Sequence, residues 1–197
     1  MAKRILIIQG HPDPAGGHLC HALADAYADG ATVAGAEVRK VEPAGLDFPI
    51  LRTQADWEQG EAGAPETLKP AIADTRWADH LLIIYPLWMG TMPALLKAFM
   101  EQAFRPGVAL GYGDKGVPEP QFKGKSARVA ITMGMPALAY RWYFGAHSLK
   151  SLEKNILKFS GVKPIRESLF GLVDVGGKQD MQKRIEAFKE TGRKDAA

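Results

Sequence analysis

The fold of this chain is decided by the stretch Leu81-Leu82-Ile83-Ile84-Tyr85-Pro86-Leu87-Trp88-Met89-Gly90-Thr91-Met92-Pro93-Ala94. An apolar run of strand length ends at Tyr85, a loop with proline and glycine carries an indole, and Pro93 opens a helical pattern. A continuous apolar run is typical of a parallel strand whose sheet is covered on both faces. The loop after such a strand lies at the carboxyl edge of the sheet, where open α/β folds bind ligands. We therefore expect Pro86–Thr91 to border a flat aromatic ligand.

Strand and helix patterns alternate on both sides of this stretch. The expected strands are 4–9, 37–41, 80–85, 127–132 and 164–173, and the expected helices are 18–34, 65–77, 92–104, 147–160 and 178–191. The segments 43–65 and 105–124 are expected to be long loops, and Pro70 is expected to end or kink the helix in which it lies. Five alternations predict an α/β fold with one parallel sheet and right-handed crossovers. We expect a flavodoxin-like three-layer sandwich, in which a five-stranded sheet of order 2-1-3-4-5 has helices on both faces. Residues 1–197 are expected to form a single domain.

Composition excludes several classes of protein. The net charge of the 197 residues is +3, and much of the basic excess lies near the end, as expected for a solvated helix face rather than a nucleic-acid site. The single cysteine, Cys20, permits neither an intrachain disulfide nor a multi-cysteine metal cluster. No apolar run reaches the length of a membrane span. We expect a cytoplasmic protein with no membrane span and no nucleic-acid partner.

The loop Gly10–Gly17 leads directly into a predicted helix N-terminus, where free amides and the helix dipole favour an anion. The glycine pair allows close backbone approach, and His11 and His18 can donate to phosphate oxygens. A simple strand–helix connector is the alternative. A metal site formed with His21 is a further alternative, but neither an acidic nor a cysteine partner completes it. We therefore predict a phosphate site and no metal.

The loops after the third and fourth strands should lie beside this phosphate loop. Flavodoxin-like folds bind FMN at this edge of the sheet. Its isoalloxazine ring needs an apolar contact, which Trp88 and Met89 can offer, and hydrogen bonds, which the backbone of Leu87–Gly90 can offer. Trp88 could instead fill the core. Thr132 and Gly134 should lie near the polar edge of the flavin, together with the side chains Tyr140 and His147. Tyrosine and histidine can stabilise negative charge that develops on a flavin carbonyl. Their alternative roles are a packed core tyrosine and a residue at the start of a helix.

A second glycine pattern, Gly111-Tyr112-Gly113-Asp114-Lys115-Gly116, spells the dinucleotide fingerprint G-x-G-x-x-G. It follows a helix and a loop rather than a strand, and it continues into Val117-Pro118 rather than into a helix. The structural context that gives the fingerprint its function is therefore missing, and we interpret the segment as a glycine-rich loop.

Three segments resemble the NAD(P)H:quinone oxidoreductase family: Gly10-His11-Pro12, Tyr85-Pro86-Leu87-Trp88 with Met92-Pro93-Ala94-Leu95-Leu96-Lys97, and Asp114-Lys115-Gly116. The resemblance spans roughly residues 3–175, and the second segment is its most specific part. It implies a homodimer with non-covalent FAD or FMN. It also implies hydride transfer from NAD(P)H to the flavin and then to a quinone or a similar flat acceptor.

The resemblance also implies site residues, position by position. The phosphate loop is matched by His11, His18, Leu19 and Cys20; the isoalloxazine loop by Pro86, Leu87, Trp88, Met89 and Gly90; and the opposite loop by Thr132, Met133 and Gly134. Tyr140 matches a tyrosine beside the flavin carbonyl, with His147 near the family histidine. Tyr112 and Phe144 are expected in the substrate pocket. Family members usually carry serine and a polar residue such as asparagine where this chain has His18 and Cys20.

Two other functions are compatible with the same fold. A one-electron carrier of the flavodoxin type usually has a strongly acidic docking face, and the net charge of +3 argues against it. A flavin-binding ancillary subunit that regulates a membrane transporter would keep the flavin site and use its surface for a partner.

Overall fold

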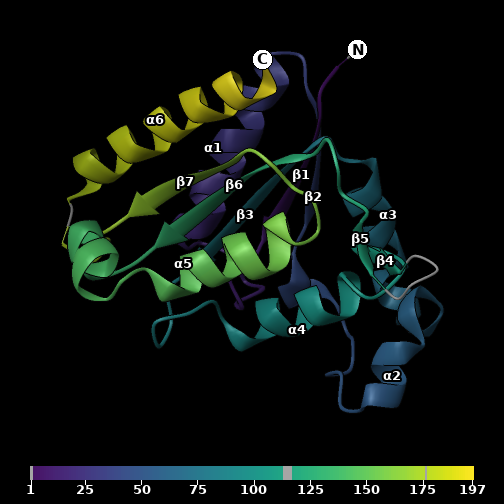
Figure 1. Cartoon of the computed structure of the whole chain (residues 1–197). Coiled ribbons are helices and arrows are strands. Elements are labelled where there is room, and N and C mark those ends of the chain that lie inside the picture. Colours follow the sequence, from purple (N-terminus) through teal and green to yellow (C-terminus); the bar gives the residue numbers. More distant parts are fainter. Residues whose placement is uncertain (1, 113–116, 176) are drawn as a thin grey trace.

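A five-stranded parallel sheet forms the centre of the molecule (Figure 1). The computed structural model describes residues 2–112, 117–175 and 177–197. The strand order is β2-β1-β3-β6-β7, formed by β1 (Arg4–Gln9), β2 (Glu37–Val41), β3 (His80–Pro86), β6 (Ser126–Thr132) and β7 (Ile165–Phe170). These five strands correspond in chain order to the five expected from the sequence. The predicted order 2-1-3-4-5 is confirmed.

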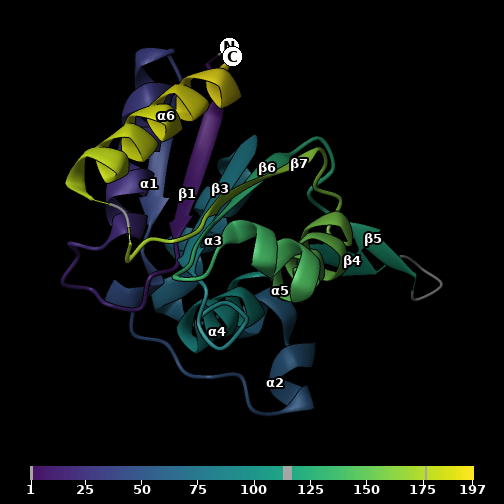
Figure 2. The ribbon, with the colours of Figure 1, turned by 90° about the vertical axis from the view of Figure 1, so that its left-hand side faces the viewer.

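Helices cover both faces of this sheet, so the three-layer arrangement is also confirmed (Figure 2). One face carries α1 (Leu19–Val33) and α6 (Lys178–Ala196), and the other carries α3 (Lys69–Trp77), α4 (Ala94–Ala103) and α5 (His147–Ser151). A π-helical segment, Leu152–Lys158, continues α5, and another spans Ala139–Tyr143. Short 3₁₀ turns span Pro43–Gly45, Gly60–Gly63 and Glu66–Leu68.

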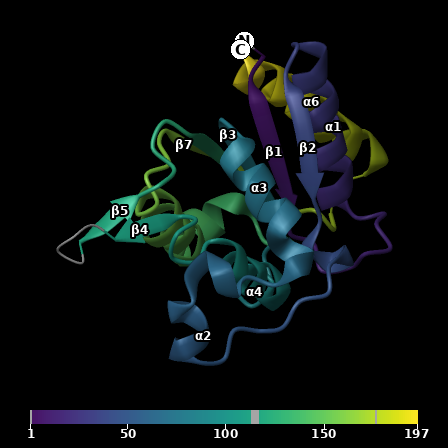
Figure 3. The ribbon, with the colours of Figure 1, turned by 90° about the vertical axis from the view of Figure 1, so that its right-hand side faces the viewer.

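Two segments expected to be loops contain short elements of their own. Helix α2 (Gln54–Glu58) lies within the predicted loop 43–65, and its first turn is capped by the Thr53 hydroxyl, which accepts from the Asp56 amide. The predicted loop 105–124 contains β4 (Leu110–Tyr112), which pairs antiparallel with β5 (Pro118–Pro120) away from the main sheet (Figure 3). Pro70 lies in the first turn of α3, where its missing amide removes no helical hydrogen bond. It therefore helps to start that helix rather than end or kink it.

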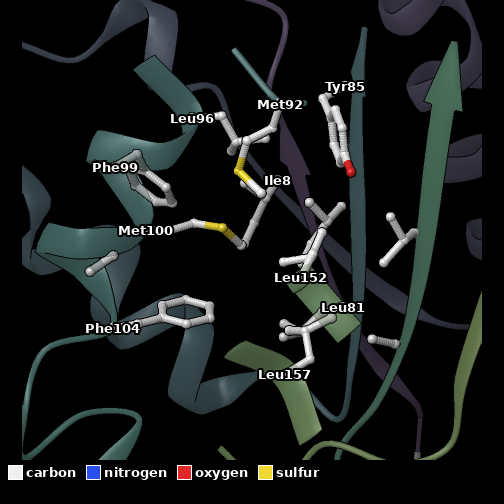
Figure 4. Packing of buried hydrophobic residues seen from close by; sticks show 14 of the residues in the cluster. Ile8, Leu81, Tyr85, Met92, Leu96, Phe99, Met100, Phe104, Leu152 and Leu157 are labelled. Atoms are coloured by element: carbon white, nitrogen blue, oxygen red, sulfur yellow. The ribbon is translucent and has the colours of Figure 1, made fainter. Parts of the chain in front are cut away.

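The larger core lies between the sheet and α4 (Figure 4). Leu96, Phe99 and Met100 of α4 face Leu81 of the sheet, while Lys97 remains on the exposed side of the helix. This burial follows the i, i+3, i+4 spacing of apolar residues in the sequence. Leu152 and Leu157 of the segment after α5 close the same core. The core thereby fixes β3 and the start of α4, which flank the loop around Trp88.

Helices α1 and α6 pack against each other through glycines. A Cβ added at Gly30 would overlap the backbone carbonyl of Lys189, and a Cβ at Gly192 would overlap that of Tyr27. Both obstacles are backbone atoms, which cannot rotate away. Glycine is therefore required at both positions by the close approach of the two helices.

Replacing Gly30 by alanine should lower the free energy of unfolding by about 1–3 kcal/mol, although alanine favours a helix by about 1 kcal/mol. The added methyl group forces α1 away from α6, and urea unfolding would measure the loss. Asp29→Ala, at the exposed neighbouring position, is the matched control and should stay within about 0.5 kcal/mol of the wild type. Equal stability of the Gly30 variant and the wild type would contradict the close packing of these helices.

Candidate functional site

A cavity of about 520 Å³ opens at the carboxyl edge of the sheet, beside the loops after β1, β3, β6 and β7. Ten of the twelve predicted cofactor residues line it: His11, His18, Leu19, Cys20, Pro86, Leu87, Trp88, Thr132, Met133 and Gly134. Segments more than a hundred residues apart in sequence therefore meet in one site. The cavity also contains three residues that were not predicted: Gly17, Val173 and Asp174. Asp174 follows β7, and because all parallel strands end at the same edge, its position after the fifth strand was the available signal.

The first wall of the cavity is formed by the loop between β1 and α1. The His11 amide donates to Gln9 Oε1 at 2.7 Å, and the Asp13 amide donates to His11 Nδ1 at 3.2 Å. This second contact makes Nδ1 an acceptor, so the neutral His11 ring carries its proton on Nε2. Asp13 also accepts from the Ala15 amide and pairs with His18 Nε2 at 2.7 Å. The loop is thus held by its own side chains, and Gly16 and Gly17, both with positive φ, complete the turn into α1.

Three imidazoles gather at this helix start. The His11 ring stacks on that of His18, with centroids 3.9 Å apart, and His21 lies 5.3 Å from His11 and 5.7 Å from His18. Burial and the two neighbouring imidazoles lower the pKa of His11 to about 4, and burial also lowers the pKa of His21. Two like charges about 5 Å apart repel by roughly 3 kcal/mol at an effective dielectric constant of 20. The cluster therefore resists multiple protonation unless an anion compensates the charge.

The loop after β3 forms a tight turn at the second wall. Trp88 and Thr91 exchange two backbone hydrogen bonds of 2.9 Å, and the residues between them, Met89 and Gly90, have φ values of 48° and 79°. A turn with positive φ at both central positions suits glycine at the second position. The turn leaves the Trp88 side chain half-exposed at the cavity, with its ring centroid 6.0 Å from that of His11. Trp88 therefore borders the cavity instead of filling the core.

The third wall is formed by the end of β6 and the loop after β7. The Leu87 amide donates to the Thr132 carbonyl, and the Met133 amide donates to that of Phe170, so adjacent loops are fixed to each other. Cys20 Sγ lies 3.2 Å from Thr132 Oγ1, and burial raises the pKa of the Cys20 thiol to about 11. The thiol therefore stays protonated and unreactive at neutral pH. A Cβ at Gly134 would lie 2.8 Å from Asp174 Oδ2, so glycine keeps this side of the cavity open.

The remaining predicted cofactor residues, Met89 and Gly90, form the tip of the turn and lie outside this cavity. Met89 is fully exposed and lines a second, apolar cavity of about 460 Å³. Trp88 lines both cavities, and Lys97, Ser148 and Ile156 form the far wall of the second. The indole is therefore a shared wall between the two spaces.

Tyr140 and His147 are placed differently from the expectation that both face a flavin. Tyr140 is only 2% exposed in the core, where its hydroxyl accepts from the Leu149 amide at 3.1 Å and burial raises its pKa. It does not line the cavity, because the π-helical segment turns it toward α5. His147 is exposed at the start of α5 and is not part of the cavity either. The alternative roles from the sequence, a packed tyrosine and a helix-starting histidine, describe their positions here.

Of the two expected substrate-pocket residues, the structure describes only the side chain of Phe144, which does not line this cavity. Phe144 is half-exposed and stacks edge-to-face on Tyr143, away from the lining residues. The side chain of Tyr112 lies outside the described part of the structure, as do Gly113–Gly116 of the glycine-rich loop.

The donor set of the first cavity fits a flavin phosphate. Leu19 and Cys20 occupy the first positions of α1, where amides have no carbonyl partner within the helix. His11 is 8% exposed, and its Nε2 meets no hydrogen-bond partner among the described residues although it borders the cavity. The open turn at Gly16 and Gly17 and the indole of Trp88 complete an anion site beside an aromatic wall. Among the described residues, no group of three or more His, Cys, Asp or Glu side chains is arranged to hold a metal ion.

A parallel sheet with a phosphate-type loop after its first strand and an aromatic turn after its third is the arrangement typical of α/β proteins that bind ligands at the carboxyl edge of the sheet. Residues 3–193 match the family model described as the flavodoxin-like fold, and the chain belongs to this family. The sequence resemblance to quinone oxidoreductases is also confirmed by its relatives.

Two relatives carry the name FMN-dependent NADH:quinone oxidoreductase. The protein of Nitratidesulfovibrio vulgaris is 27% identical over 190 residues, which cover 87% of this chain and 88% of the relative. The protein of Bordetella avium is 27% identical over 124 residues, covering 63% of this chain but only 58% of the relative. Among solved structures, the NAD(P)H:quinone oxidoreductase of Methanothermobacter marburgensis superimposes with a TM-score of 0.82 over 98% of each chain at 21% identity, which confirms the fold.

Across the described residues, none of the helices combines the length and the apolar character needed to cross a membrane.

Proposed function

We propose that this protein is an enzyme that binds FMN in the carboxyl-edge cavity and transfers hydride from NADH or NADPH to a quinone or a similar flat acceptor. The observation that carries the proposal is the convergence of the phosphate-type loop, the Trp88 turn and the end of β6 on one cavity. The relatives named FMN-dependent NADH:quinone oxidoreductase support FMN over FAD. When bound, the isoalloxazine ring would accept a hydride from the nicotinamide and pass it to the acceptor.

The chain's own residues would hold and orient the flavin. The amides of Leu19 and Cys20, with the helix dipole of α1, favour the phosphate group. Trp88 and Leu87 offer an apolar edge for the ring system, and the backbone around Met133 and Gly134 lies on the opposite wall. A site of fixed loops that excludes water strengthens each polar contact with the ring.

We further propose a homodimer of one flavin-binding domain spanning residues 1–197. Its support is the exposure of several large apolar side chains, among them Met89 and the sequence neighbours Leu138, Trp142, Tyr143 and Phe144. Exposed aromatic and apolar side chains of this kind are enriched in contact sites between subunits. Tyr112 and Phe144 would complete the substrate pocket from the partner subunit. The nicotinamide donor and the single buried cysteine support a cytoplasmic location.

The purified protein, reconstituted with FMN, should be yellow, and anaerobic NADH or NADPH should bleach the 450 nm region until menadione restores it. Hydride must reside on the flavin between the two half-reactions, so absorbance in stopped-flow mixing reports each half separately. Riboflavin and FAD serve as comparison ligands for the identity of the cofactor. A folded protein that binds no flavin, or that binds FMN without reduction by either nicotinamide, would contradict the proposed function. The second outcome would instead favour a regulatory flavin-binding subunit.

A further inference from the structure

The phosphate loop of this chain differs from ordinary anion sites, because imidazoles gather where hydroxyl and amide side chains are usual. His11, His18 and His21 lie with ring centroids between 3.9 and 5.7 Å apart at the first turn of α1. His11 and His18 line the cavity, and His21 lies behind them on the first turn of α1. Lysine and arginine carry a fixed charge near neutral pH, whereas imidazole can take up a proton there.

We propose that these three histidines form a proton-linked receptor for a phosphate monoester, so that binding of FMN is accompanied by uptake of about one proton into the cluster. This inference rests on the proposed function. It identifies the histidine cluster as the group that determines which flavin the protein prefers.

One imidazole of the cluster offers a free donor to the cavity. His11 is 8% exposed, its Nδ1 accepts from the Asp13 amide, and its Nε2–H therefore remains for a ligand. His21 Nδ1, behind it, is buried and has no hydrogen-bond partner among the described residues. An unpaired buried polar atom is costly, and a hydrogen bond that forms when the cluster rearranges around an anion would remove this cost.

The charges that surround the cluster favour one added proton over several. Carboxylates from four segments surround the histidine cluster or its cavity: Asp13 in the same loop, Asp25 on α1, Glu42 after β2 and Asp174 after β7. The positive charge that opposes them is Lys40 of β2, which pairs with Asp25 and Glu42. Asp13 is already engaged with His18 and with the Ala15 amide. The stacked rings repel when more than one is charged. A phosphate dianion reverses this balance, because it attracts a proton to the nearest imidazole.

The direction of the pH dependence follows from the surroundings of His11. Burial and the neighbouring imidazoles lower the pKa of His11 to about 4, so this ring is neutral at pH 7 before the ligand binds. A bound dianion raises the pKa of the cluster, and the complex holds more protons than its separate components. Affinity for FMN should therefore fall as pH rises, by up to about tenfold per pH unit for each proton taken up.

The same chemistry distinguishes phosphate monoesters from diesters. A monoester has a second pKa of about 6 and is a dianion above it, whereas each phosphate of FAD carries a single charge. Riboflavin carries none. The uptake of protons on binding, and with it the pH dependence of Kd, should therefore be large for FMN, smaller for FAD and absent for riboflavin.

Isothermal titration of the apoprotein with FMN at pH 7.5, in buffers of different ionisation enthalpy, would count the protons directly. Uptake of about one proton for FMN and none for riboflavin is expected. His11→Gln and His21→Gln should each reduce the uptake and flatten the dependence of Kd on pH between 6.5 and 8.5. His147→Gln, which removes an exposed imidazole outside the cavity, is the matched control and should leave the uptake unchanged. Circular dichroism would confirm folding of each variant.

The outcomes separate this inference from the proposed function. Tight FMN binding without proton uptake, or equal uptake for FMN and riboflavin, would overturn the histidine receptor and leave the flavin enzyme intact. Unchanged uptake in both cluster variants would also overturn it. A folded wild-type protein that binds no flavin would overturn both.

Discussion

Replacing Asp195 by alanine is expected to lower the free energy of unfolding by about 3 kcal/mol, because it leaves Arg128, whose side chain is 11% exposed, without its counter-ion. Asp195 is 1% exposed near the end of α6 and accepts hydrogen bonds from Arg128 and Arg166 and, at 2.9 Å, from the Tyr27 hydroxyl. Burial raises the pKa of this carboxyl, but the Arg128 hydrogen bond and charge outweigh burial and hold the pKa below its usual range. One carboxylate thus joins α6 to α1, β6 and β7.

Urea unfolding at neutral pH would measure this loss. Asp180→Ala is the matched control, because Asp180 lies on the same helix and also pairs with an arginine, Arg184, but is half-exposed. An exposed pair contributes about 0–1 kcal/mol, so the control should change little. The depressed pKa of Asp195 also means that its contribution is present above pH 4 and is lost as the pH falls through its folded-state pKa. A loss as small as that of the control would contradict the proposed strength of this network.

Replacing Gly134 by leucine should weaken FMN binding by roughly a hundredfold, if filling the cavity costs about 3 kcal/mol. Gly134 lines the cavity, and its added Cβ would lie 2.8 Å from Asp174 Oδ2, the end of a flexible side chain. A methyl group can therefore be accommodated by a small movement of Asp174, whereas a branched side chain must enter the space proposed for the flavin. Because Gly134 is exposed and its backbone has no positive φ, folding should be unaffected.

Quenching of FMN fluorescence would give the affinity, and NADH:menadione activity at low FMN should fall in parallel. Gly134→Ala is the control for backbone effects and should bind FMN within a few-fold of the wild type. Excess FMN should partly restore the activity of the leucine variant, since the substitution removes space rather than a reacting group. Wild-type affinity in the leucine variant would place the flavin elsewhere on the molecule.

Sequence patterns were sufficient for the architecture because hydrophobic periodicity reports burial directly. The apolar run His80–Tyr85 could only be a strand covered on both faces, and every residue of it is buried. Strand order decides which loops share an edge, and the family resemblance supplied individual positions in those loops, so ten of the predicted cofactor residues line one cavity. Asp174 was missed, since the loop after β7 carries no unusual composition of its own.

Side-chain direction was not accessible in the same way. Tyr140 lies in the expected loop, yet a π-helical turn of five residues directs its ring into the core rather than the cavity. One residue more or less in such a turn rotates every following side chain, and no periodic signal marks it. The three-histidine cluster is similar: the sequence shows three imidazoles near a helix start, but only the folded loop stacks them.

The stretch from Leu81 to Ala94 by itself determined a buried parallel strand, an aromatic turn at the carboxyl edge and a following helix, because each of these depends on local periodicity and turn chemistry. Only the tertiary structure decided that Trp88 borders a cavity instead of filling the core. That outcome depends on the positive φ of Met89 and Gly90 and on the neighbouring loops after β1 and β6, which leave room beside the indole. Packing between distant segments, which no local pattern encodes, made this stretch part of a binding site.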